Sequence, residues 1–268
     1  MRYALIVGID KYKNKGNNLR GCVNDAMDVF KSLRIHGLNY SNITMLLNET
    51  ATKENITFNL KRLVDGLKKG DSLTYYHSGH GTQILDKNND EVDGLDEALV
   101  TYDFDRNDAF TDDVLRDCLL NHPIGARINL IFDTCHSGGF EMNSSEQSSR
   151  SIISDDLNKI PKYKLKKLGV RQTDTHKQRH ILLAGCKEQK YSYEAKVNNK
   201  VRGLMTHSLC SLLRKNRNLD WNSFFLKLYE VVSTKTKNRQ QPQIIIPSDL
   251  LYESDGNSKI KFWQKVFR

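Results

Sequence analysis

The sequence is poor in the features that mark several classes of protein. Its 268 residues include 5 cysteines, an odd number without C-x-x-C spacing, which argues against a disulfide framework or a zinc site. No apolar run approaches the roughly 18 residues that cross a membrane, and the N-terminal run ALIVGI lacks a signal-peptide cleavage pattern. With no internal repeats, the chain predicts one cytoplasmic domain that has no contact with a membrane.

Positive charge is concentrated in the second half of the chain. Residues 1–140 carry 16 Lys and Arg against 20 Asp and Glu, whereas residues 141–268 carry 25 against 12. A basic surface permits nonspecific contact with nucleic acid. Because no nucleic-acid-binding motif is present, we expect a solvated basic face and no specific nucleic-acid partner.

Short apolar runs rich in β-forming residues alternate with amphipathic segments. This alternation favours parallel crossovers, so the predicted fold is α/β, a three-layer αβα sandwich with a mostly parallel central sheet. Thr52 is the expected N-cap of the second helix. The predicted strands are 2–9, 43–47, 71–77, 127–134, 180–186 and 243–246, and the predicted helices are 22–35, 53–68, 112–120, 203–215 and 221–236.

Two motifs carry residues typical of nucleophilic catalysis. HSGHGTQ (77–83) and INLIFDTCHSGG (128–139) lie at the ends of predicted buried strands, where ligands bind in open α/β sheets. A nucleophilic thiol needs an imidazole that takes its proton and later protonates the leaving amine, which makes His80 and Cys135 the predicted catalytic dyad. The neighbouring glycines leave room for main-chain N–H donors, and Gly81 and Cys135 are the expected oxyanion-hole positions. Taken singly, a strand-end Cys or His is more often a structural residue.

A family resemblance covers most of the chain. Besides the two motifs, it includes YALIVGID (3–10), LRGCVNDA (19–26), DGLDEALVTYDF (93–104) and FTDDVL (110–115), and it returns more weakly within 180–249. These segments resemble the metacaspases, caspase-like cysteine peptidases that cleave after Arg or Lys. The resemblance implies one caspase-type domain, made of a catalytic part (1–140), a mobile linker (141–179) and a smaller part (180–268).

The resemblance also implies the pocket for the P1 residue of the substrate. Asp25 and Asp133 match the family positions for this pocket, with Cys22 and Ser78 beside them. Carboxylates suit the task because they pair with a guanidinium in a bidentate manner. Structurally, the two aspartates are also explained as a helix-start residue and a strand-end residue.

A dense acidic stretch follows His80. Residues 85–117 contain twelve Asp or Glu, and crowded carboxylates favour a hard cation such as Ca²⁺. By resemblance the calcium ligands are Asp96, Asp112 and Asp113. The family has a further acidic ligand shortly after the nucleophile; position 142 is Met here, so Glu141 is the candidate substitute. An acidic solvated hairpin is the alternative explanation of this stretch.

We therefore expect a Ca²⁺-activated cysteine endopeptidase that acts on proteins or peptides with a basic P1 residue. We also expect a monomer without a recruitment prodomain, whose Ser- and Lys-rich segment 141–179 is a surface loop and processing site. Two alternatives stay open. One is a noncatalytic interaction module with the same fold, and the other is a caspase-like protease of another branch, such as a defence effector, with a different activator.

Overall fold

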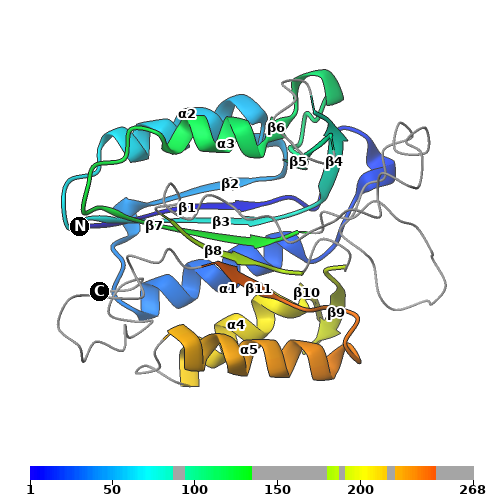
Figure 1. Cartoon of the computed structure of the whole chain (residues 1–268). Coiled ribbons are helices and arrows are strands. Elements are labelled where there is room, and N and C mark those ends of the chain that lie inside the picture. Colours follow the sequence, from blue (N-terminus) through cyan, green and yellow to red (C-terminus); the bar gives the residue numbers. More distant parts are fainter. Residues whose placement is uncertain (87–93, 135–179, 187–190, 216–220, 246–268) are drawn as a thin grey trace.

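The computed structural model describes residues 1–86, 94–134, 180–186, 191–215 and 221–245 (Figure 1). Strands and helices alternate along most of the chain, as the sequence predicts. In chain order they are β1 (Arg2–Gly8), α1 (Cys22–Ile35), β2 (Ile43–Leu47), α2 (Lys53–Asp65), β3 (Ser72–Ser78), β4 (Gly81–Leu85), β5 (Leu95–Leu99), β6 (Phe110–Thr111), α3 (Asp112–Leu119), β7 (Arg127–Asp133), β8 (His180–Ala184), β9 (Glu194–Val197), β10 (Lys200–Gly203), α4 (Leu204–Lys215), α5 (Trp221–Lys235) and β11 (Gln243–Ile245).

The central sheet has six strands in the order β11-β8-β7-β3-β1-β2. Every neighbouring pair is parallel except β11 and β8, which are antiparallel. Helices α2 and α3 cover one face of the sheet, and α1, α4 and α5 cover the other (Figure 1). The predicted three-layer sandwich with a mostly parallel sheet is confirmed.

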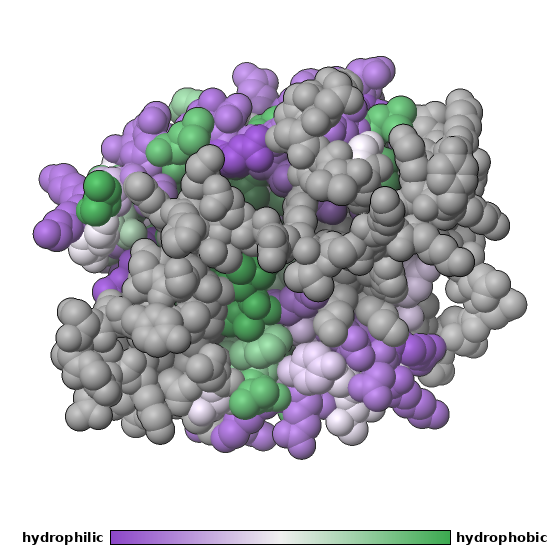
Figure 2. All heavy atoms as spheres, viewed as in Figure 1, coloured by the Kyte–Doolittle hydropathy of each residue, from purple (hydrophilic) through white to green (hydrophobic). Residues whose placement is uncertain are grey.

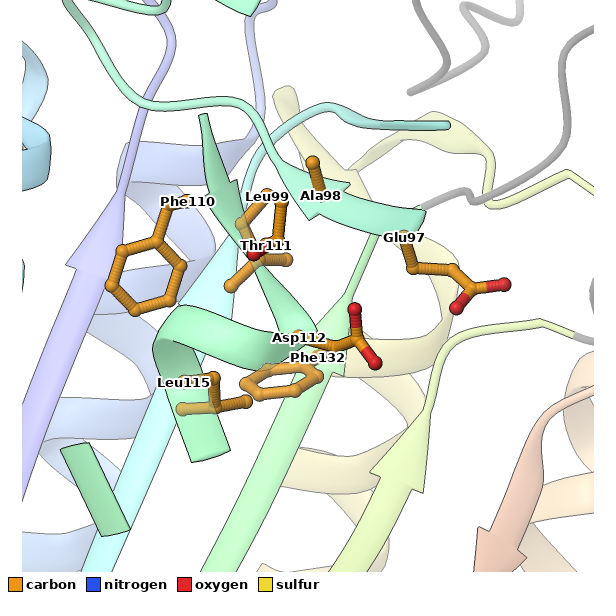
Figure 3. Close-up of a pocket in the computed structure, with 8 residues that line it drawn as sticks. All are labelled: Glu97, Ala98, Leu99, Phe110, Thr111, Asp112, Leu115 and Phe132. Atoms are coloured by element: carbon orange, nitrogen blue, oxygen red, sulfur yellow. The ribbon is translucent and has the colours of Figure 1, made fainter. Parts of the chain in front are cut away.

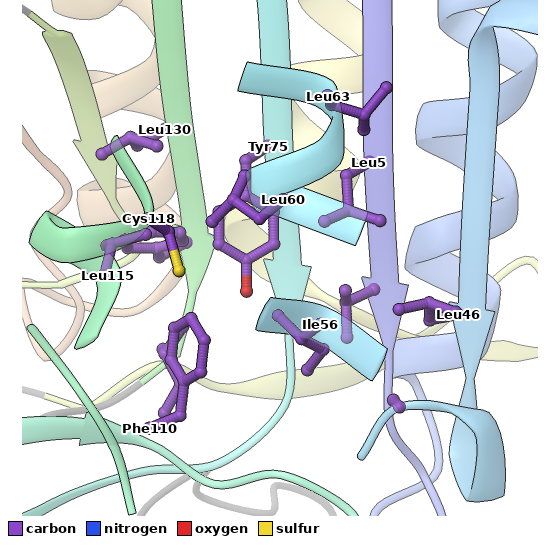
Figure 4. Close-up of a cluster of buried hydrophobic side chains, with 14 of the residues drawn as sticks. Leu5, Leu46, Ile56, Leu60, Leu63, Tyr75, Phe110, Leu115, Cys118 and Leu130 are labelled. Atoms are coloured by element: carbon purple, nitrogen blue, oxygen red, sulfur yellow. The ribbon is translucent and has the colours of Figure 1, made fainter. Parts of the chain in front are cut away.

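Each face of the sheet has its own hydrophobic core, because successive side chains of a strand point to opposite faces. Leu5 and Tyr75 pack beneath α2 and α3 (Figure 4), whereas their neighbours Ile6 and Tyr76 pack against the helices of the other face. All seven residues of β3 are buried, as expected of a central strand covered on both sides. Truncating a fully buried core residue such as Leu60 to Ala costs about 2–5 kcal/mol.

The two smaller sheets were not predicted from the sequence. One is the antiparallel sheet β4-β5-β6, and the other is the hairpin of β9 and β10. Their segments, such as LDEAL in β5, are short and mix charged with apolar residues, so they lack the apolar runs that mark the central strands. Both small sheets lie at the edge of the molecule where the strands β3 and β7 end (Figure 1).

Helix ends agree with the local sequence. The Thr52 side chain accepts a hydrogen bond from the N–H of Asn55, as predicted for an N-cap. Helix α2 ends at Asp65, three residues before the predicted end, with Gly66 as its C-cap.

Within the described ranges, no helix combines the length and apolar character needed to cross a membrane. On the face seen in Figure 2, hydrophilic residues cover much of the coloured surface along the upper and lower margins, where the helices lie.

Candidate active site

His80 lies directly after β3, and its backbone is held by Tyr12. The Tyr12 hydroxyl accepts a hydrogen bond from the His80 N–H at 2.9 Å, and the two ring centroids are 5.2 Å apart. Gly79 permits this close packing, because a Cβ at that position would lie 2.9 Å from Tyr12 Oη and 3.1 Å from His77 Nε2. With 4% of its surface exposed, His80 is fixed within a tight turn at the sheet edge.

A backbone carbonyl sets the orientation of the His80 ring. The Nε2 atom lies 2.8 Å from the carbonyl oxygen of Asn17. Since a carbonyl can only accept, Nε2 carries the hydrogen, and Nδ1 holds the lone pair of the neutral imidazole. Nδ1 is therefore the atom able to take a proton from a thiol. No pattern in the sequence points to Asn17, because a main-chain carbonyl is available at every residue.

The sheet brings the strands that lead into the two predicted catalytic motifs to one edge. Strands β3 and β7 are parallel neighbours, and Ser78 pairs in register with Asp133 at their carboxyl ends. His80 follows Ser78 by two residues, and Cys135 follows Asp133 by two. The predicted nucleophile Cys135 and the candidate ligand Glu141 lie outside the described residues.

Asp25 and Asp133 are fully buried; Asp25 accepts hydrogen bonds from Gly203, the last residue of β10, and Asp133 from the first turn of α4. Both carboxylate oxygens of Asp25 lie 3.0 Å from the N–H of Gly203, and its Oδ2 also accepts from the Ser78 hydroxyl at 3.1 Å. Asp133 Oδ2 accepts from the N–H and the hydroxyl of Thr206, at 3.0 and 2.7 Å. Its Oδ1 accepts from the hydroxyl of Ser192. Negative charge is favourable at a helix N-terminus, so both aspartates stabilise α4.

Cys22 opens α1 between two carboxylates. The Asp10 carboxylate accepts from the Cys22 N–H at 2.7 Å, and the Glu194 carboxylate accepts from the N–H groups of Gly21 and Arg20 at 2.8 and 3.3 Å. The Cys22 thiol lies 3.8 Å from Glu194 Oε1. Asp10, Cys22 and Glu194 form the one group of three potential metal ligands within 4.8 Å that occurs in the described part of the chain. The Asp10 carboxylate caps α1, whereas Glu194 binds the N–H groups just before the helix. Glu194 was not among the predicted site residues.

The four predicted pocket residues gather at this edge of the sheet. Ser78 bonds to Asp25 and pairs with Asp133 in the sheet register. Cys22 precedes Asp25 by three residues on α1, a spacing that places both on one side of the helix. Gly81, the predicted oxyanion-hole residue, opens β4 one residue after His80.

The predicted calcium ligands come from two adjoining segments. Asp96 belongs to β5 and is 5% exposed, whereas Asp112 and Asp113 open α3, where Asp113 is paired with Arg116. The pairing of β5 with β6 brings these segments together. A small pocket lies here, with the carboxylates of Glu97 and Asp112 toward one side (Figure 3). It is lined by Glu97, Ala98, Leu99, Phe110, Thr111, Asp112, Leu115 and Phe132.

The described cysteines form no disulfide bond. Cys22, Cys118, Cys186 and Cys210 are buried and unbridged, in agreement with the prediction that they form no disulfide framework. Burial raises the pKa of Cys210 to about 12 and also raises the pKa of Cys118. These two thiols are therefore poor nucleophiles at neutral pH.

Comparison with known proteins agrees with this architecture. The family model described as the caspase domain of the C14 peptidases matches residues 1–249. Metacaspase-1 of Candida albicans is 27% identical over 92% of this chain and 65% of that protein. Metacaspase-1 of Lodderomyces elongisporus is 27% identical over 90% of this chain and 64% of that protein. Metacaspase-1A of Aspergillus oryzae is 28% identical over 98% of this chain and 72% of that protein. The chain thus spans slightly less than two thirds of the first two relatives.

A solved structure shows the same fold. The crystal structure of a protein from Geobacter sulfurreducens superposes with a TM-score of 0.67 and 21% sequence identity, covering 91% of this chain and 92% of that one. The predicted caspase-type fold is therefore confirmed. From the match of the family model over residues 1–249 and the similarity to the fungal proteins, the chain belongs to the caspase-domain family and, within it, groups with the metacaspases.

Proposed function

We propose that the protein is a cysteine endopeptidase that cleaves peptide bonds after Arg or Lys. Membership of the caspase-domain family supports the cysteine peptidase chemistry. The observation that carries the specificity is the pair of fully buried carboxylates, Asp25 and Asp133, at the edge of the sheet where His80 is fixed.

The proposed mechanism uses His80 and Cys135. Nδ1 of His80 takes the thiol proton, and the Cys135 thiolate attacks the carbonyl carbon of the P1 residue. The imidazolium then protonates the departing amine, which leaves an acyl-enzyme, and water hydrolyses this thioester to release the new carboxylate and regenerate the thiol. The Asn17 carbonyl keeps the ring oriented throughout. The N–H groups of Gly81 and Cys135 are the proposed donors to the oxyanion.

Selection of a basic P1 residue follows from the charge of the pocket. Hydrogen bonds from Gly203 and from α4 hold Asp25 and Asp133 in place. Each carboxylate oxygen has two lone pairs, so an oxygen that accepts from the protein can also accept from a guanidinium. An acidic P1 side chain would meet like charges in a desolvated pocket, where the repulsion costs several kcal/mol.

Calcium activation forms part of the proposal. Asp96, Asp112, Asp113 and Glu141 would supply the carboxylate oxygens that Ca²⁺ prefers. The burial of Asp96 supports this assignment, because a buried carboxylate needs a compensating charge or donors. For Asp113, binding requires exchange of its partner Arg116 for the cation. The role of Ca²⁺ would be to neutralise these charges and order the segments beside the site.

The test is a panel of fluorogenic peptides that differ only at P1, assayed with and without Ca²⁺. Wild-type protein should cleave the Arg and Lys peptides and leave the Asp peptide intact, and Cys135→Ala and His80→Ala should be inactive although folded. Substantial turnover by Cys135→Ala would refute the dyad. Absence of any cleavage, together with no labelling of Cys135 by a thiol-directed active-site probe, would favour the noncatalytic interaction module.

A further inference from the structure

We infer that Glu194 is a positioning residue for the P1 pocket, holding the start of α1 so that Cys22 and Asp25 face the substrate. This inference rests on the proposed function and adds a residue that acts through the main chain. Glu194 is 2% exposed, and a carboxylate buried to that degree needs several donors.

The donors of Glu194 are the residues that lead into α1. Oε1 accepts from the Gly21 N–H at 2.8 Å and lies 3.8 Å from the Cys22 thiol, while Oε2 accepts from the Arg20 N–H at 3.3 Å. One carboxylate from β9 therefore fixes three consecutive residues at the other end of the chain. Hydrogen bonds to an ionised acceptor are roughly twice as strong as neutral ones, so the charge of Glu194 matters to this contact.

The same hairpin holds the pocket at a second point. In the β9–β10 pairing, Glu194 is the register partner of Gly203, whose N–H bonds to both oxygens of Asp25. The hairpin thus contacts α1 before its first residue through Glu194 and one turn later through Gly203. Loss of the first contact leaves Asp10 as the one remaining carboxylate of this pair at the start of α1, which loosens the position of the Asp25 carboxylate.

Gly21 is adapted to this contact. A Cβ at residue 21 would lie 2.8 Å from Glu194 Oε1 and 3.1 Å from the backbone of Arg202. Gly21→Ala therefore displaces Glu194 without changing any charge, whereas Glu194→Gln removes the charge and keeps the shape. Both variants disturb the Glu194 contact, by different means, and Gly21→Ala also crowds the backbone of Arg202.

A matched control exists on the same interface. Arg202 of β10 donates to Asp28 of α1 at 2.6 Å, and both side chains are 14% exposed. Asp28→Asn weakens the attachment of the hairpin to α1 about one turn beyond Asp25, at a contact that includes no pocket residue. Its stability loss serves as the reference for a purely structural effect.

The experiment compares three readouts in wild-type protein and these variants. Glu194→Gln and Gly21→Ala should raise KM for the Arg peptide on the order of 10-fold with a smaller change in kcat, because P1 binding is affected and the dyad is not. Alkylation of Cys135 by iodoacetamide, a reagent without a P1 side chain, should proceed at the wild-type rate. Asp28→Asn should lower the melting temperature with KM unchanged.

The outcomes separate this inference from the proposed function. If wild-type protein prefers Arg and Lys at P1, and Glu194→Gln and Gly21→Ala both keep the wild-type KM, the positioning role of Glu194 is wrong while the proposed function stands. An equal rise of KM in Asp28→Asn would also overturn the inference, because the effect would then follow general stability. If wild-type protein shows no preference for a basic P1 residue, the proposed specificity itself fails.

Discussion

The N–H of Gly203 lies 3.0 Å from both carboxylate oxygens of Asp25, joining two segments that are 178 residues apart in the sequence. The relationship is reciprocal. Asp25 and Asp133 from the N-terminal part hold the start of α4, and Glu194 from the C-terminal part holds the start of α1. The residues proposed to bind P1 therefore also join the two parts of the domain.

The Tyr12 hydroxyl should contribute to the placement of His80. Tyr12→Phe removes the acceptor of the His80 N–H, so we expect a lower kcat and a loss of about 1 kcal/mol in the free energy of unfolding. Peptide hydrolysis and urea denaturation measure the two effects. The control is Tyr40→Phe, since Tyr40 is 69% exposed, and it should change neither quantity. Wild-type kcat in Tyr12→Phe would show that the Asn17 contact suffices.

Asp133→Asn should reduce the selection of a basic P1 residue. The substitution removes one of two negative charges from the pocket, so the ratio of kcat/KM for Arg over Leu peptides should fall about 10-fold or more, because buried charged hydrogen bonds contribute about 1.5–3 kcal/mol. Thr206→Val is the control, because it removes a hydroxyl bonded to Asp133 and leaves the charge. An unchanged Arg-to-Leu ratio in Asp133→Asn would remove this residue from the pocket.

Calcium should raise the rate, and Asp96→Asn or Asp112→Ala should abolish the stimulation. Mg²⁺ should substitute poorly, because it demands octahedral geometry and gives up its water reluctantly. Asp117→Asn, at an exposed position of the same helix α3, is the matched control and should respond as wild type. Equal activity in chelator and in millimolar Ca²⁺ would identify the acidic stretch as a charged surface only.

The segment 141–179, which lies outside the described residues, should be the site of self-cleavage. It contains nine candidate P1 residues, namely Arg150, Lys159, Lys162, Lys164, Lys166, Lys167, Arg171, Lys177 and Arg179. The pieces should co-elute in gel filtration, because β7 and β8 are paired in the sheet from Ile128 and His180 onward. Mass spectrometry after incubation with Ca²⁺, beside Cys135→Ala, locates the cuts. An intact chain, or cuts only elsewhere, would contradict the prediction.

Acid should destabilise the fold through His180. Burial, with a smaller effect of the nearby His122, lowers the pKa of His180 to about 4 from an ordinary value of about 6.5. Since the folded state favours the neutral ring, its contribution to stability is complete above pH 6.5 and is lost as the pH falls toward 4. Urea denaturation at pH 7.5, 5.5 and 4.5 should show a shallower decline for His180→Gln. Identical pH profiles would refute this assignment.

The central architecture was accessible from the sequence because its signals are local. The continuous burial of β3 and the Thr52 cap each leave a pattern within a few residues. The small sheets and Glu194 were missed for different reasons. The strands of the small sheets pair with near neighbours in the chain, but they are short and of mixed polarity, as in β5, and so lack a clear strand pattern. Glu194 contacts residues that are more than 170 positions away, and a single glutamate gives no sign of such a partner. Asp25 and Asp133 were found through family resemblance, whereas their bonds to α4 appear only in three dimensions.

The dependence of the pocket on α4 has a consequence for biosynthesis. During translation, His80, Cys135, Asp25 and Asp133 leave the ribosome before Gly203 and Thr206 have been made. A nascent chain of that length holds every residue of the proposed dyad, yet the two carboxylates of the proposed pocket still lack the N–H donors of Gly203 and Thr206. The proposed P1 pocket would therefore acquire these hydrogen bonds only after Gly203 and the first turn of α4 have been synthesised and have docked.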